Sequence, residues 1–268
     1  NDPESVINSY YIPQGVAADL VATIEGISRT ELDNFAIRSH HLAAAAKEAG
    51  KFSPVIEAIR DQSGLLILDE DVLPQADISA KDLAPLPPRF AEMGIAGFDG
   101  MALHRFPWVA KINHLHTRGN TSANADGAAV CLLGTLERGQ QLGLQPRAKI
   151  RSAAMATVDA TLLTGGVAAA DAALKKAGLD REDVDLWEFN ESFAAPAIGF
   201  QRSLNLPEDK FNVNGGAIAL GEPLGAVGAM MLCQLLCELE QRDKSIGLLT
   251  IDAGSGLALS TVIERSTS

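Results

Sequence analysis

The sequence predicts an α/β fold with a layered mixed sheet and helices, most clearly over its second half. From residue 147 onward, apolar segments of strand length alternate with longer segments of helical periodicity, a pattern typical of layered α/β domains. The chain closes on two apolar segments at 246–252 and 257–265, which predict antiparallel strands because only Ala-Gly-Ser-Gly separates them. A glycine-rich stretch at 212–228 joins a strand end to a helix, and such a junction can offer backbone N–H groups to a ligand.

The first half is predicted to be helical at its start and irregular after that. Ser28 with Glu31 three residues later forms a capping-box pattern, and Gly50 is a typical helix end, so a long helix is expected between them. Prolines are frequent from 70 to 107 and periodicity is weak, so this region is expected to be mostly loop. The helices expected in this half lie at 14–25 and 29–49, with one short helix near 83–93, and the short strands at 55–60 and 65–69.

The second half contains the alternation of helices and strands. Asp126 is placed to cap the helix that follows it, and Asp180 with Asp183 to form a capped turn. Pro223 suits a first helical turn, where its missing N–H costs nothing. The expected helices lie at 128–138, 166–177, 193–204 and 223–242. The expected strands lie at 148–153, 184–189, 211–214, 246–252 and 257–265.

Composition narrows the class of partner. The formal net charge of −12 argues against nucleic acid and anionic membranes as partners. No apolar run reaches the roughly 18 residues of a membrane span, and no signal-peptide pattern is present. Three cysteines give no disulfide framework and indicate a reducing compartment, so a cytoplasmic protein is expected. The sequence begins at Asn1 rather than Met, which suggests a processed, trimmed or partial chain.

Three motifs carry the functional signal. They are Trp-Glu-Phe-Asn-Glu-Ser-Phe-Ala at 187–194, the glycine-rich stretch at 212–228, and Thr-Ile-Asp-Ala-Gly-Ser-Gly-Leu-Ala at 250–258. In this order and spacing they closely resemble the thiolase family, whose motifs read roughly Asn-Glu-Ala-Phe-Ala, Gly-Gly-Ala-Ile-Ala-x-Gly-His-Pro-x-Gly and Cys-x-Gly-Gly-Gly-x-Gly. The segments at 65–74 and 83–90 look most like the thiolase subunit of bacterial trifunctional fatty-acid oxidation complexes.

The resemblance implies three catalytic positions, two of them substituted. Asn190 matches the family's Asn, which helps to hold an oxyanion-hole water. Glu222 stands where the family has its catalytic His, and Asp252 where it has its acid/base Cys. The residues implied to bind substrate are Ser122, Gly215, Gly216, Gly254 and Gly256.

Coenzyme A is implied as a substrate, and no cofactor or metal is expected. His114 and His116 would share one face of an extended segment, and two histidines could bind a metal. No third ligand is spaced nearby, so hydrogen-bonded or pocket-lining histidines are expected instead.

The resemblance also implies a domain organisation. Residues 1–116 match the loop domain that covers CoA and the acyl chain, 117–146 the last helix of the N-terminal thiolase half, and 147–268 the C-terminal thiolase domain. The family's nucleophilic Cys belongs to the N-terminal half, of which this chain holds only the end. Without that half the chain would expose a large apolar surface, so pairing with a polypeptide that supplies it, or with a second copy, is expected.

Three functions remain open. The first is a diverged thiolase-family acyltransferase chain of fatty-acid metabolism, which binds or acts on 3-ketoacyl-CoA or acyl-CoA but is not competent for ordinary thiolysis. The second is a non-catalytic structural subunit of a heteromeric thiolase-fold complex. The third is a carboxylate-based lyase or aldolase that uses Glu222 and Asp252. If these two carboxyl groups lie close together, they would share a proton and one pKa would rise.

Overall fold

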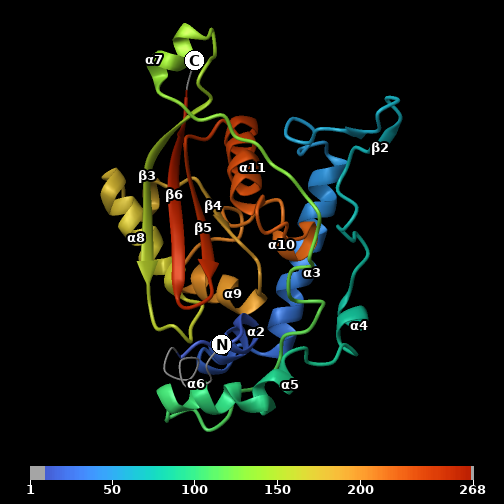
Figure 1. Cartoon of the computed structure of the whole chain (residues 1–268), viewed down its shortest axis with the longest axis vertical. Helices are drawn as coiled ribbons and strands as arrows, with labels where there is room; N and C mark the ends of the chain where they lie inside the picture. Colours follow the sequence, from blue (N-terminus) through green and yellow to red (C-terminus); the bar gives the residue numbers. More distant parts are fainter. Residues whose placement is uncertain (1–9, 267–268) are drawn as a thin grey trace.

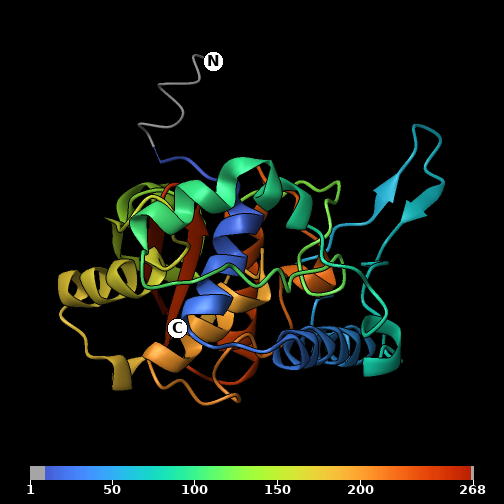
Figure 2. The same cartoon turned by 90° about the horizontal axis from the view of Figure 1, so that it is seen from below.

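A computed structural model describes residues 10–266 of the chain. Residues 1–9 of the expected loop domain, and residues 267–268 of the expected C-terminal domain, lie outside the described part. Helices flank a four-stranded sheet on both faces, and a helical and irregular N-terminal part packs at one side of it (Figures 1 and 2). No helix in the described part is long and apolar enough to cross a membrane.

The sheet is mixed, as predicted. Its strands lie in the order β3 (Ala148–Thr157), β6 (Leu257–Arg265), β5 (Ile246–Ala253) and β4 (Leu186–Phe189). β6 is antiparallel to both of its neighbours, which confirms the predicted closing hairpin, and β4 is parallel to β5. Helix α8 (Gly165–Ala177) covers one face, and helix α11 (Val227–Gln241) packs against the other (Figure 1). Both helices were expected, although α11 begins four residues after Pro223.

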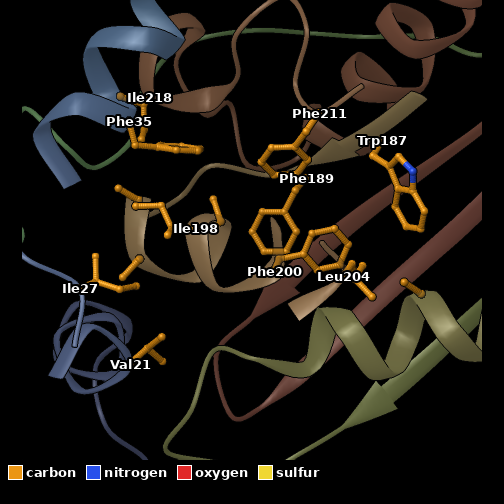
Figure 3. Packing of buried hydrophobic residues seen from close by; sticks show 14 of the residues in the cluster. Val21, Ile27, Phe35, Trp187, Phe189, Ile198, Phe200, Leu204, Phe211 and Ile218 are labelled. Carbon is orange, nitrogen blue, oxygen red and sulfur yellow. The ribbon is translucent and has the colours of Figure 1, made fainter. Parts of the chain in front are cut away.

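The main core joins the sheet to the N-terminal helices (Figure 3). Phe200 of α9 (Ala194–Ser203) packs against three rings, with its centroid 4.7 Å from that of Phe189 and 6.2 Å from those of Trp187 and Phe211. Helices α2 (Gln14–Ile24) and α3 (Arg29–Glu48) pack on α9. These ring contacts hold α9 against the end of β4, and Asn190 lies in the short segment between the two elements.

The N-terminal part has more short elements than expected. The Ser28 cap is confirmed, since its hydroxyl accepts from the Glu31 N–H at 3.3 Å, but the Glu31 side chain contacts Arg202 instead of closing a capping box. The remaining elements are β1 (Ile59–Arg60), β2 (Leu66–Leu68), α4 (Ala80–Leu83), α5 (Ala91–Met93), η1 (Gly94–Phe98), α6 (Asp99–Arg105), α7 (Leu136–Gln141), η2 (Arg181–Asp183) and α10 (Ala217–Leu220). The expected strands at 55–60 and 65–69 are therefore shorter than predicted, and 211–214 forms only isolated bridges, Phe211 to Trp187 and Val213 to Gly215.

The predicted helix at 128–138 is wrong. Residues 121–135, called the strap below, run without a helix, and only α7 forms after Thr135, whose hydroxyl caps it. Val130 and Leu132 of the strap are 89% and 81% exposed. A short helix is unstable in water unless its apolar side chains are packed, and these side chains are exposed.

Apolar side chains are also exposed on β3 and β6. Met155 is 70% exposed and lies opposite Leu259, on the same sheet face as Ile263, which packs with α11. The exposed large apolar residues of the strap, α7 and these two strands are Val130, Leu132, Leu133, Leu136, Ile150, Met155, Leu257 and Leu259, called the apolar face below.

Candidate active site

Three segments that are distant in sequence meet at the end of β4. Asn190 follows β4 directly, and its N–H donates to the Thr250 carbonyl at 3.0 Å, which continues the pairing with β5. The strap is bonded to both of the other segments. The Ser122 N–H donates to the Ser192 carbonyl at 3.0 Å, just after β4, and the Glu222 N–H in the loop after α10 donates to the Ala123 carbonyl at 2.8 Å. The sheet end, the strap and the loop after α10 are thus fixed to one another by backbone bonds.

Glu222 lies at the centre of this meeting point. Its Oε1 accepts from Asn190 Nδ2 and from Ser192 Oγ, both at 2.6 Å, and its Oε2 accepts from Ser122 Oγ at 2.5 Å. Asn190 Nδ2 also donates to Ser192 Oγ at 2.9 Å. Three of the predicted site residues, Asn190, Glu222 and Ser122, are therefore brought together around one carboxylate.

Sequence reasoning missed Ser192. The available signal was that Ser192 stands where the thiolase motif has Ala, so a hydroxyl and a carboxylate replace the family's Ala and His together. The structure places those two substituted groups in direct contact.

Asp252, at the end of β5, is separate from this cluster. Its Oδ1 is buried without a hydrogen-bond partner. Burial raises the pKa of Asp252 to about 8, and the Gly166 N–H lowers it only in part. No hydrogen bond joins Asp252 to Glu222 within the described residues, so the predicted cause of a raised pKa, a shared proton, is corrected to burial.

The predicted glycines are engaged within the chain. Gly215 has φ +74°, and a Cβ there would lie 2.3 Å from the Ser39 carbonyl, so this glycine permits close approach to α3. The Gly216 N–H donates to Ser39 Oγ at 3.0 Å, so it is not the free amide that the glycine-rich loop predicted. Gly216 itself has a negative φ.

Gly254 and Gly256 lie in the turn between β5 and β6. Gly256 has φ +68°, and its carbonyl accepts from the Val158 N–H at 2.9 Å. A Cβ on Gly254 would touch the Gln14 side chain. Their role in substrate binding stays a prediction, as it does for Gly215 and Gly216.

Two glutamates of the 187–194 motif are buried behind the site. Glu191 is fully buried and accepts from Ser39 Oγ at 2.5 Å and from Asn212 Nδ2 at 2.7 Å. Glu188 is 7% exposed and lines a small cavity with Asn190, between α10 and α11. Burial, and then the charges of Glu191 and Glu238, raise the pKa of Glu188 well above its usual value.

A second titratable network supports the start of α9. Asp19 is fully buried and accepts from His114 Nδ1 at 2.8 Å and from His116 Nδ1 at 2.7 Å. His116 Nε2 accepts from the Ala195 N–H at 3.2 Å, and His114 Nε2 lies 3.1 Å from Asp99 Oδ2. These histidines are hydrogen-bonded, as expected, and no group of three potential metal ligands occurs in the described part.

Comparisons with known proteins agree with this architecture. The family model described as thiolase, C-terminal domain, matches residues 144–265, and that described as thiolase, N-terminal domain, matches residues 4–97. The 3-ketoacyl-CoA thiolase of Yersinia pestis is 40% identical over 260 residues, which are 94% of this chain and 62% of that protein. The acetyl-CoA acetyltransferase of Chromobacterium violaceum is 38% identical over 262 residues, which are 96% of this chain and 61% of that protein.

Solved structures give the same relation. The Bacillus anthracis acetyl-CoA acetyltransferase has a TM-score of 0.82 at 33% identity, covering 95% of this chain and 60% of that one. Human mitochondrial 3-ketoacyl-CoA thiolase has a TM-score of 0.81 at 30% identity, covering 96% and 60%. The chain thus spans about 62% of the length of the curated relatives it matches.

Proposed function

The chain belongs to the thiolase family, and from this premise we propose that it binds acyl-CoA ligands at the Glu222 cluster without performing ordinary thiolysis as it stands. The observation that carries this proposal is the Glu222 carboxylate, held by Asn190, Ser192 and Ser122. The family's thiolysis, as the resemblance implies it, needs a thiolate nucleophile and a His that activates it. An ionised carboxylate at the His position repels a thiolate by like charge and has no proton to donate to an oxyanion.

The three cysteines of this chain lie apart from the Glu222 cluster. Cys131 and Cys233 lie with their sulfur atoms 3.5 Å apart, and Cys237 contacts the Lys51 carbonyl and Gln241. None of the three is hydrogen-bonded to the Glu222 cluster. Their free state fits the reducing cytoplasm in which fatty-acid metabolism would use this chain.

A further polypeptide segment is part of the proposal. The apolar face exposes eight large apolar side chains, and large exposed apolar patches mark interaction sites. A partner polypeptide that supplies an N-terminal thiolase half, or a second copy of this chain, would cover it. Light scattering of the purified chain should then give an oligomer or aggregate, whereas a monodisperse monomer would contradict this part of the proposal.

The test of function is binding and turnover measured together. Isothermal titration with acetoacetyl-CoA and with CoA should give saturable binding, and the same preparation should show no thiolysis of acetoacetyl-CoA by added CoA. The isosteric variant Glu182→Gln, on an exposed turn, is a control for nonspecific charge effects and should leave binding unchanged. Thiolysis at ordinary rates by the chain alone would overturn the proposal.

Two other functions remain candidates. A non-catalytic structural subunit would bind no CoA compound in the same titration. A carboxylate-based lyase or aldolase is favoured by one observation, the pKa of about 8 at Asp252, because such a group can hold and release a proton near neutral pH. Cleavage of a 3-hydroxyacyl-CoA with a pH–rate profile that changes near pH 8, and loses that change in Asp252→Asn, would support it.

A further inference from the structure

The hydrogen-bond donors of the Glu222 cluster are all in use. Asn190 Nδ2 carries two hydrogens, and the structure gives it two acceptors, Glu222 Oε1 at 2.6 Å and Ser192 Oγ at 2.9 Å. The single hydrogen of the Ser192 hydroxyl goes to Glu222, and so does that of Ser122. The cluster therefore has no side-chain donor left for a ligand.

The orientation of the Asn190 amide follows from its neighbour. With the amide reversed, the Asn190 carbonyl oxygen would stand 2.6 Å from the Glu222 carboxylate, oxygen against oxygen. The carboxylate accepts only, so the nitrogen must face it. Asn190 Oδ1 is the group that remains, and it is an acceptor.

Glu222 also retains accepting capacity. A carboxylate offers about four lone-pair sites, two on each oxygen. Oε1 accepts two bonds and is filled, whereas Oε2 accepts one bond from Ser122 and has one site open. What the cluster presents to a ligand is thus Glu222 Oε2 and Asn190 Oδ1, two acceptors.

We propose that this site selects a ligand that donates a hydrogen bond, namely a 3-hydroxyacyl thioester in preference to a 3-ketoacyl thioester. The inference rests on the proposed function, since it assumes that the cluster receives an acyl-CoA, and it specifies the oxidation level of the acyl group. A hydroxyl at C3 can donate a hydrogen bond to Glu222 Oε2. A ketone at C3 offers only lone pairs, so its oxygen would face the negatively charged Glu222 carboxylate without a hydrogen bond. Leaving such a buried group unpaired is what makes polar sites selective.

Ser192 is a specificity residue in this arrangement. It binds both Asn190 and Glu222, so it takes up an Asn190 hydrogen that would otherwise be available to a ligand oxygen. Replacing Ser192 by Ala returns that hydrogen and should weaken the preference for a donor ligand. Replacing Glu222 by Gln provides an amide that can itself donate, and should weaken the preference further or reverse it.

The experiment compares four probes on the full chain by isothermal titration: CoA, acetoacetyl-CoA, and the two C3 stereoisomers of 3-hydroxybutyryl-CoA. We expect one hydroxy stereoisomer to bind at least about tenfold more tightly than acetoacetyl-CoA. The ratio should fall several-fold in Ser192→Ala and to one or below in Glu222→Gln, and it should persist in the control Glu182→Gln. Circular dichroism checks that each variant is folded. If Glu222→Gln is not folded, the inference is tested by the affinity ratio of wild type and its change in Ser192→Ala.

Different binding results contradict the inference and the proposed function. Equal binding of both ligand classes, or tighter binding of acetoacetyl-CoA, overturns the inference and leaves acyl-CoA binding intact. A wild-type preference that Ser192→Ala and Glu222→Gln both leave unchanged also overturns it, because the preference would then arise elsewhere. Absence of binding by all four probes overturns the proposed function and the inference together.

Discussion

Replacing Asp252 by asparagine should stabilise the folded chain at neutral pH. Asp252 lies at the end of β5 with Oδ1 buried and without a hydrogen-bond partner. Burial raises its pKa from 3.8 to about 8, so the folded state disfavours the ionised carboxyl. Asparagine has the same shape and no charge to bury.

The sign and size of the effect follow from linkage. Below pH 3.8 both folded and unfolded states hold the proton, so the pKa difference has no effect on stability. Between pH 3.8 and about 8 the unfolded state releases the proton while the folded state keeps it, which lowers the free energy of unfolding by about 1.4 kcal/mol per pH unit. At pH 7 the upper limit is about 4 kcal/mol, and an asparagine amide left partly unpaired reduces the expected gain to about 2 kcal/mol.

The assay is urea unfolding of wild type and Asp252→Asn at several values between pH 4 and pH 9. Relative to wild type, the variant should be about 2 kcal/mol less stable at pH 4, where only the cost of the amide remains. The difference should shift in favour of the variant as pH rises and level off above about pH 8. Asp69→Asn, at an exposed aspartate, is the matched control and should show no such shift. A difference that stays flat with pH, or a variant less stable than wild type at pH 7, would refute the reasoning.

Two further predictions concern the supports of the site. Although burial lowers the pKa of His114, its two carboxylate partners raise it above 6.5 overall, so its contribution is complete below about pH 6.5 and is lost as pH rises through the folded pKa. His114→Gln should therefore cost about 1–2 kcal/mol at pH 6 and less at pH 9, measured by urea unfolding; equal cost at both would contradict this. Gly215→Ala should cost about 2 kcal/mol or more, because of its positive φ and the Ser39 carbonyl 2.3 Å from the added Cβ. Gly225→Ala, whose Cβ meets open space, should cost under about 0.5 kcal/mol by the same measurement, and similar costs for the two would reject the steric argument.

The thiolase family and much of its architecture could be identified from the sequence. The closing hairpin of β5 and β6, the helices α3, α8 and α9, and the mixed sheet all follow from patterns a few residues long, because side chains alternate along strands and recur every turn along helices. Motif order and spacing identified the family that the comparisons confirm. The same motifs pointed to Asn190 and Glu222, which the structure joins.

The helix expected at 128–138 shows where local pattern was insufficient. Its residues have helical periodicity, but an amphipathic helix of this length is stable only when its apolar side chains are packed, and in the described part of the chain they are largely exposed. The result is an extended strap with exposed Val130 and Leu132. Whether such a segment is helical is decided by what packs on it.

The sequence by itself pointed to Ser122, Asn190 and Glu222, and only the tertiary structure brought them together with Ser192 and decided which of their hydrogen-bonding groups are already paired. Ser122, Asn190 and Glu222 are up to 100 residues apart, and nothing in their spacing reveals that every donor among them is already paired. Ser192 gained a role only because β4, the strap and the loop after α10 meet at one point. Asp252 likewise owes its raised pKa to burial and not to a neighbouring carboxylate. Hydrogen-bond capacity and desolvation depend on the atoms within a few ångströms of a group, and folding brings those atoms from distant parts of the chain.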